Sequence, residues 1–165
     1  MYQGDSSLFT VSEMSDKGSA DSQSSRLLVD DTDMLFAHLD STLDGSKSQV
    51  HMFNDNSGME IVSDLALVHY LLSSGKVAEV VLQLKPYPFF VSDAVPSDID
   101  HTLRVLAAAD SANQKQVAQD LRKFMREGKL LLTTSGPINN FLASPEPMWS
   151  MSPQVRGNFY FYFLF

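Results

Sequence analysis

The apolar positions of this chain fall into three short runs separated by segments with helical spacing. The runs cover 50–53, 77–84 and 130–134, and six of the eight residues of 77–84 are apolar. Continuous apolar runs of this length are typical of strands that are buried on both faces of a parallel sheet. The segments between them repeat apolar residues every three to four positions, which indicates amphipathic helices. The resulting order, βαβααβ, predicts an α/β fold: a three-layer, partial parallel (Rossmann-like) sheet with flanking helices.

The helices can be placed from their spacing and their end signals. A helix is predicted over 58–74 and ends at Gly75. Its expected apolar face consists of Met59, Val62, Ala66, Leu67 and Leu71. A second helix is expected to begin with Ser97 as its N-cap, and a third to run from Asn113 to Gly128. Ahead of all these, the acidic run 30–33 predicts the capped start of a short helix over 34–39.

The two ends of the chain differ from the middle. Residues 1–25 contain eight serines and few apolar residues, which predicts a flexible polar segment. Residues 26–29 have strand character, and Ser152-Pro153 resembles a helix start that no helix follows. Residues 158–165 hold six aromatic residues among eight and are interpreted as an aberrant tail. The expected folded domain is therefore 26–157.

Composition narrows the class of protein. The 165 residues include 44% hydrophobic residues, which suits one globular domain. The formal net charge of −8 argues against nucleic acid as a partner. The absence of cysteine leaves only oxygen and imidazole ligands for any metal. No apolar run reaches the roughly 18 residues of a spanning helix, and the first residues do not resemble a signal peptide. We therefore expect no membrane contact and a cytoplasmic location that could extend to the nucleus.

The most informative stretch is the polar turn Asp55-Asn56-Ser57-Gly58, between the first predicted strand and its helix. In parallel sheets this junction lies at the ligand-binding edge, and the helix N-terminus offers backbone N–H groups to an anion. The simpler interpretation is a turn in which Asp or Asn caps the helix. After the second strand, two prolines hold an extended path that could bring Asp93 to the same edge.

Two motifs carry a resemblance to a known family: FNDNSGMEIVSDL over 53–65 and KPYPFFVSD over 85–93. They resemble the metal-dependent damage-control phosphatases, once called domain of unknown function 89. The similarity is to the branch of sugar-phosphate phosphatases that are also described as acidic-residue protein methyltransferases. Weaker similarity extends from Tyr2 to about Val155.

The resemblance implies a metal site and a reaction. Asp55, Asn56 and Asp93 would hold one divalent cation, manganese, nickel or cobalt, and Asp55 and Asp93 would be the catalytic residues. Asp55 and Asn56, with Ser57, Gly58 and Glu60, would contact the substrate. The reaction would be hydrolysis of a small phosphorylated metabolite, such as fructose 1-phosphate, in hexose phosphate damage control. Oxygen ligands suit such a cation.

Several features of the family are missing from this sequence. A preceding helical region, a later Lys-Gly-Asp-type loop and a basic Arg-Thr-x-Lys element are absent. The fold is therefore expected to be incomplete and truncated at both ends, with weak or no turnover. The alternatives are a non-catalytic fragment and an S-adenosylmethionine-dependent protein carboxyl methyltransferase. The sequence shows no glycine-rich nucleotide loop for the methyltransferase, and the oligomeric state is not indicated.

Other polar residues have simpler interpretations. The four histidines lack metal-ligand spacing, so surface positions or hydrogen bonds within the core are expected. Asp64 could support the site or make a local hydrogen bond. Lys85 could meet a phosphate, but a lysine at the end of a buried strand more often reaches solvent. Asp31-Thr32-Asp33 resembles the start of the Asp-x-Asp-x-Thr motif of aspartate-nucleophile phosphatases, but Met34 and Leu35 follow it, so the final threonine of the motif is missing. The run is interpreted as a helix cap.

Overall fold

The computed structural model describes residues 30–135 and 139. Four predictions lie outside these residues: the flexible segment 1–25, the strand at 26–29, the start of a helix at Ser152-Pro153 and the aromatic tail 158–165. The chain divides into two compact units, 1–42 and 43–165. Each unit is described by itself.

The described part of the first unit is the helix α2, Thr32–Thr42. The carboxylate of Asp30 accepts a hydrogen bond from the backbone N–H of Thr32 at 3.1 Å, and Asp33 lies in the first turn. A carboxylate at this end satisfies a free N–H group and opposes the positive end of the helix dipole. The predicted helix with an acidic start is confirmed, but it is longer than the expected 34–39 at both ends.

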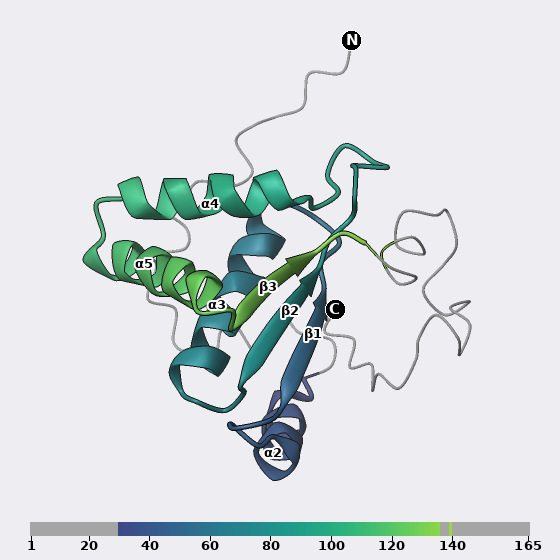
Figure 1. Cartoon of the computed structure of the whole chain (residues 1–165), viewed down its shortest axis with the longest axis vertical. Helices are drawn as coiled ribbons and strands as arrows, with labels where there is room; N and C mark the ends of the chain where they lie inside the picture. The colour runs from purple at the N-terminus through teal and green to yellow at the C-terminus, as the bar shows by residue number, and fades with distance from the viewer. Residues whose placement is uncertain (1–29, 136–138, 140–165) are drawn as a thin grey trace. The chain divides into compact units, whose positions relative to one another are not determined.

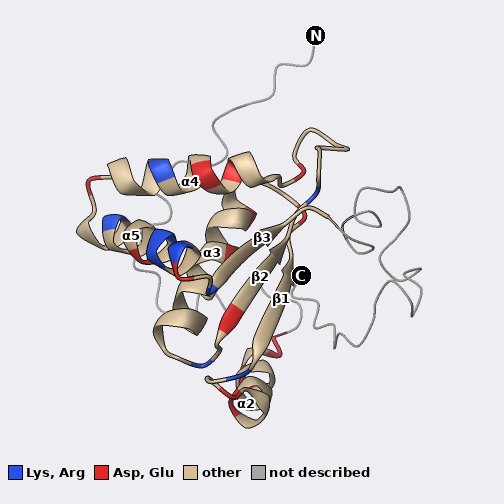
Figure 2. Ribbon diagram, viewed as in Figure 1, with Lys and Arg blue, Asp and Glu red and all other residues tan. Residues whose placement is uncertain are grey.

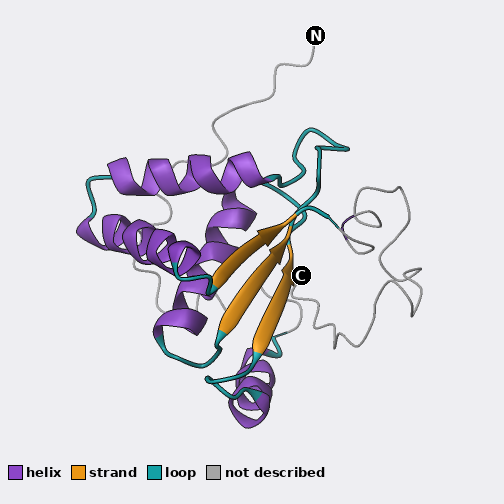
Figure 3. Ribbon diagram, viewed as in Figure 1, coloured by secondary structure: helices purple, strands orange, loops and turns teal. Residues whose placement is uncertain are grey.

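The second unit is built on a three-stranded parallel sheet in the order β1-β2-β3 (Figures 1 and 3). The strands are β1 (Gln49–Phe53), β2 (Glu79–Gln83) and β3 (Leu130–Thr133). In the register, Val50 lies opposite Val80, and Val80 opposite Leu130. The central strand β2 has its last four residues buried, as its continuous apolar run predicts. The α/β class and the partial parallel sheet are confirmed.

Three helices flank the sheet: α3 (Met59–Ser73), α4 (Pro96–Ala108) and α5 (Ala112–Arg126). The hydrophobic core contains alternate residues of each strand and the buried faces of all three helices. Alternate strand residues point to one face of a sheet, so this core lies between that face and the helices. Its central members are Val80, Leu82, Ile61, Ile99 and Leu121.

The face that α3 presents to the core was predicted only in part: Leu71 is buried and Leu67 is partly buried against the core, as expected. The buried residues are Ile61, Leu65, Val68, Leu71 and Leu72. Met59, Val62 and Ala66 are exposed instead. The helix is apolar almost all round, so periodicity alone does not select a face. Its orientation on the sheet makes the choice.

The start of α4 was also predicted incorrectly. Its N-cap is Val95, and Pro96 occupies the first turn. The carboxylate of Asp98 reaches back to accept a hydrogen bond from the backbone N–H of Val95 at 3.0 Å. Proline is favoured in the first helical turn because its missing N–H is not needed there. The predicted start of α5 is off by one residue, because Ser111 is its N-cap.

Charged residues of both signs occur along α4 and α5 (Figure 2). Asp100 pairs with Arg104 at 3.1 Å within α4 and with Arg122 of α5 at 3.9 Å. These side chains are largely exposed, so each ion pair contributes little to stability. Packing of Ile99 and Leu103 in the core therefore fixes α4 more firmly than its charges do.

The other face of the sheet carries a chain of polar side chains across β1 and β2. Glu79 bonds to Gln49, whose Oε1 lies 2.6 Å from His51 Nε2. The amide nitrogen of Gln83 lies 2.8 Å from His51 Nδ1. Since an amide nitrogen only donates, Nδ1 accepts, and the neutral ring carries its proton on Nε2. Hydrogen bonding is one of the two roles expected for the histidines.

This arrangement predicts a stability change with pH. Burial lowers the pKa of His51, and the nearby charge of Glu79 offsets that only in part. As pH falls below about 6.5, the unfolded chain takes up a proton that the folded chain does not, so stability decreases until the folded pKa is passed. Urea unfolding at several pH values should show this loss, and His51→Gln should remove it. A variant with the wild-type pH dependence would contradict the prediction.

Candidate functional site

Two loops join at the carboxyl end of the sheet, one following β1 and the other following β2. Asn56 and Asp93 form an antiparallel bridge between them. The N–H of Ser57 donates to the carbonyl of Ser92 at 2.7 Å, and the N–H of Ala94 to the carbonyl of Asp55 at 2.9 Å. These backbone bonds hold the polar turn of the first loop against the aspartate of the second. The expectation that Asp93 returns to the edge that carries Asp55 is confirmed.

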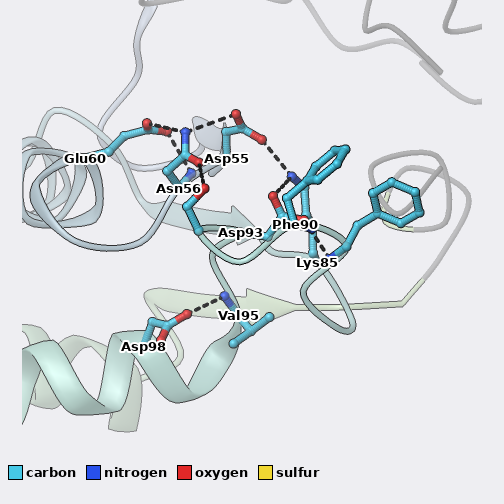
Figure 4. A network of polar contacts seen from close by, with 10 residues as sticks. Asp55, Asn56, Glu60, Lys85, Phe90, Asp93, Val95 and Asp98 are labelled. Atoms are coloured by element: carbon cyan, nitrogen blue, oxygen red, sulfur yellow. Dashed lines mark hydrogen bonds and ion pairs between the residues drawn. The ribbon is translucent and has the colours of Figure 1, made fainter. Parts of the chain in front are cut away.

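The ammonium group of Lys85 lies between the two aspartates (Figure 4). Its Nζ donates to Oδ1 of Asp55 and to Oδ1 of Asp93, both at 2.7 Å. Lys85 is 7% exposed, which corrects the expectation that it simply reaches solvent. Burial would lower the pKa of Lys85, but its bonds to the two carboxylates outweigh that and raise it. The group is therefore a fixed cation.

The carboxylate of Asp93 has donors on both oxygens. Oδ1 accepts from Lys85, and Oδ2 accepts from the backbone N–H groups of Phe89 and Phe90 at 2.7 and 2.8 Å. Burial would raise the pKa of Asp93, but the bonds from Lys85 and the two N–H groups outweigh it and lower the pKa. A carboxylate held in its charged form is a weak proton acceptor and a good cation ligand.

Asn56 lies at the centre of a second group of contacts. Its amide nitrogen donates to Oε2 of Glu60 at 3.0 Å and to Oδ2 of Asp55 at 3.2 Å. Its backbone N–H donates to Oε1 of Glu60 at 3.1 Å. Its amide oxygen accepts from the hydroxyl of Ser92 at 2.8 Å. The side chain is thereby oriented with its amide nitrogen toward the carboxylates of Asp55 and Glu60 and its oxygen toward the second loop.

Gly58 opens α3 in a conformation that favours glycine, with φ 76° and ψ −130°. No side chain caps this end of the helix, so the simpler interpretation of Asp55 or Asn56 as a side-chain cap is wrong. The N–H of Ser57 is engaged by Ser92. The N–H groups available to an anion therefore begin at Gly58 and the first turn of α3, because a helix leaves its first N–H groups without internal partners.

Asn54, just before the turn, is 1% exposed. Its amide nitrogen donates to Oδ2 of Asp64 at 2.7 Å, so Asp64 makes a local hydrogen bond, one of the two roles expected for it. Burial raises the pKa of Asp64, although the bond from Asn54 partly offsets this. Among the described residues, Oδ1 of Asn54 is the buried side-chain polar atom that has no hydrogen-bond partner.

The structure thus assembles Asp55, Asn56, Glu60 and Asp93 at one edge, as the two motifs suggest. Their roles in binding or catalysis stay predictions. Sequence reasoning missed the hydroxyl of Ser92, although Ser92 belongs to the second motif and directly precedes Asp93. It also missed Asn139, which is buried and donates to the carbonyls of Leu84 and Thr133 at 2.8 and 2.9 Å. The residues around Asn139 have no periodic pattern that could have predicted this contact.

The donor set fits a hard or borderline divalent cation. The oxygens of Asp55 and Asp93 converge on one positive charge, the ammonium of Lys85, and the oxygen of Asn56 lies on the same edge. Carboxylate and amide oxygens are the ligands that such cations prefer. Within residues 30–135 and 139, no cluster of three His, Cys, Asp or Glu side chains could hold a metal. A site here would therefore need a further oxygen ligand beside these carboxylates, and the amide oxygen of Asn56 accepts from Ser92 in this structure.

The fold and this edge define an α/β domain with an acidic site at the carboxyl ends of two neighbouring parallel strands. The family described as the damage-control phosphatase ARMT1-like domain matches residues 4–160 of the chain. The chain belongs to this family. Both motifs that carry the resemblance lie inside the matched region.

Individual relatives agree with the family. The chain is 33% identical to the zebrafish (Danio rerio) damage-control phosphatase ARMT1 over 108 residues, which cover 62% of this chain and 24% of that protein. Against the mouse (Mus musculus) protein the identity is 26% over 137 residues, 81% of this chain and 30% of the relative. Against the human (Homo sapiens) protein the identity is 32% over 84 residues, which cover 51% of this chain and 19% of the relative. The chain thus spans less than a third of these relatives.

Within the part of the chain that the structure describes, no helix combines the length and the apolar character needed to cross a membrane.

Proposed function

We propose that this chain carries the cation-binding edge of a metal-dependent phosphatase that hydrolyses sugar phosphates such as fructose 1-phosphate. The observation that supports it most directly is the convergence of Asp55 and Asp93 on one cation, at 2.7 Å each. The divalent metal, manganese, nickel or cobalt, would be held by Asp55, Asn56 and Asp93. When bound, it would polarise the phosphoryl oxygen and lower the pKa of a bound water.

The remaining roles fall to the chain's own groups. The N–H groups at Gly58 and the first turn of α3 would receive phosphoryl oxygens. Glu60 also lies at this helix end, where its carboxylate accepts from Asn56. It would orient the amide of Asn56 and, beside Asp55, could align the attacking water. Asp93, held in its charged form, suits ligation better than proton transfer. Weak turnover is expected, because the basic element that would grip the phosphate is absent from these 165 residues.

Isothermal calorimetry followed by phosphate release tests this proposal. Wild-type protein is titrated with manganese, cobalt and nickel, and each metal form is then incubated with fructose 1-phosphate and other sugar phosphates. Asp55→Ala should lose metal binding and phosphate release with little effect on folding, because the Asp55 side chain is 68% exposed. Asp110→Ala, at an exposed position away from the site, is the matched control and should behave as wild type.

The outcomes separate the proposal from its alternative. Metal binding without release of phosphate from any sugar phosphate would favour a non-catalytic metal-binding fragment. A wild-type protein that neither binds these metals nor hydrolyses sugar phosphates would overturn the proposal. Hydrolysis that persists unchanged in Asp55→Ala would place the site elsewhere.

A further inference from the structure

Lys85 is a buried lysine at the proposed cation site. It is 7% exposed, and its ammonium already bonds to both aspartates that would hold the metal. A buried ammonium needs such partners, because leaving water is costly for a charge. One of the two aspartate charges is therefore balanced by a residue of the same chain before any ligand arrives.

A divalent cation at the same carboxylate oxygens would meet this ammonium. Two positive charges that share the same oxygens repel each other strongly in a poorly solvated site. Oδ2 of Asp93 cannot simply take over, because it accepts from the N–H groups of Phe89 and Phe90. The side of the cluster toward Asp55 is open, since the Asp55 side chain is 68% exposed. The ammonium therefore has an exit toward solvent on that side.

We propose that Lys85 is the internal counter-cation of this site: its ammonium competes with a divalent cation for Asp55 and Asp93 and, once displaced, receives an anionic phosphoryl group at the rim. The proposal rests on the proposed function for its ligand class, a phosphate monoester. It gives Lys85 the role of a competitor of the metal and of a binding residue for the anion. A displaced lysine would supply a positive charge close to the N–H groups at the start of α3.

The test compares Lys85→Met with wild type and with Lys129→Met. Methionine keeps much of the unbranched apolar stem and removes the charge. Lys129 forms an ion pair with Glu127 and is about half exposed, so its variant should behave as wild type. Calorimetry with manganese alone should show at least about tenfold tighter binding for Lys85→Met, because the competing charge is gone. Calorimetry with inorganic phosphate at saturating manganese should show binding to wild type and at least about tenfold weaker binding to Lys85→Met.

A purely structural role for Lys85 predicts a different result. If the lysine only holds the two aspartates together, Lys85→Met should bind manganese as wild type does or more weakly, and either result overturns the proposal. So does phosphate binding that the substitution leaves unchanged. Circular dichroism melts establish that each variant is folded.

If Lys85→Met does not fold, the wild-type protein still provides a test. Nitrogen-15 NMR of the lysine ammonium groups, with magnesium as a diamagnetic metal, should show the Lys85 signal changing as the metal binds. A signal unaffected by saturating magnesium overturns displacement. The two proposals can fail separately: phosphate release by wild type with no tightening in Lys85→Met removes only the role of Lys85, whereas tightening without any turnover removes only the phosphatase activity.

Discussion

Replacing Asp93 with alanine should lower the free energy of unfolding by about 3 kcal/mol, the range found when one partner of a buried ion pair is removed. The Asp93 side chain is 3% exposed and accepts three hydrogen bonds, one from Lys85 and two from backbone N–H groups. Alanine leaves the N–H groups of Phe89 and Phe90 without this acceptor and the Lys85 ammonium with only Asp55. Urea unfolding analysed by linear extrapolation measures the loss.

Asp55→Ala is the matched control for that prediction. Asp55 lies at the same 2.7 Å from the same ammonium, but its side chain is 68% exposed. Water can replace it as a partner of the lysine, so the expected loss is about 0–1 kcal/mol, as for surface ion pairs. Equal losses for the two variants would show that burial does not distinguish the two carboxylates.

The second large effect is expected at Leu82, in the middle of the central strand. Leu82 is 0% exposed and lies between Met52 of β1 and Leu132 of β3 in the register. Leu82→Ala should lower the free energy of unfolding by about 3 kcal/mol, from lost burial and from the cavity that remains. Chemical denaturation of the purified variant measures it.

Leu131→Ala provides the comparison within the same sheet. Leu131 is 39% exposed on β3, so the same substitution there removes less buried surface, and the expected loss is about 1 kcal/mol. If the exposed leucine proved as costly as the buried one, the packing of helices against the Leu82 face would not be the main source of stability.

The elements of the fold could be predicted from the sequence because their signals are local. The apolar runs that became β1, β2 and β3, and the polar turn ahead of α3, depend only on neighbouring residues. The helix α5 was also predicted from its own spacing, and its buried residues include Leu121 and Phe124, because the rest of that helix is strongly polar. The buried face of α3 was predicted only in part, because apolar residues lie all round the helix and only packing against the sheet decides which of them are covered.

For the site, too, some features could be predicted from local sequence and others could not. The residue types and the spacing of the two motifs are local information, and their resemblance to a known family brought Asp55, Asn56 and Asp93 into one hypothesis. The environment of Lys85 is not local. Whether a lysine at a strand end reaches solvent or binds two carboxylates depends on a loop 30 residues away in sequence, which supplies Asp55.

By itself, the sequence determined the α/β class, the order of strands and helices, and the acidic edge after the first two strands, because each follows from periodicity, turn residues and motif spacing. Only the tertiary structure decided that Asp93 is buried while Asp55 is exposed, and that Lys85 pairs with both. Burial and ion pairing depend on which segments lie together in space, and backbone hydrogen bonds between the two loops hold Asp55 and Asp93 at the same edge.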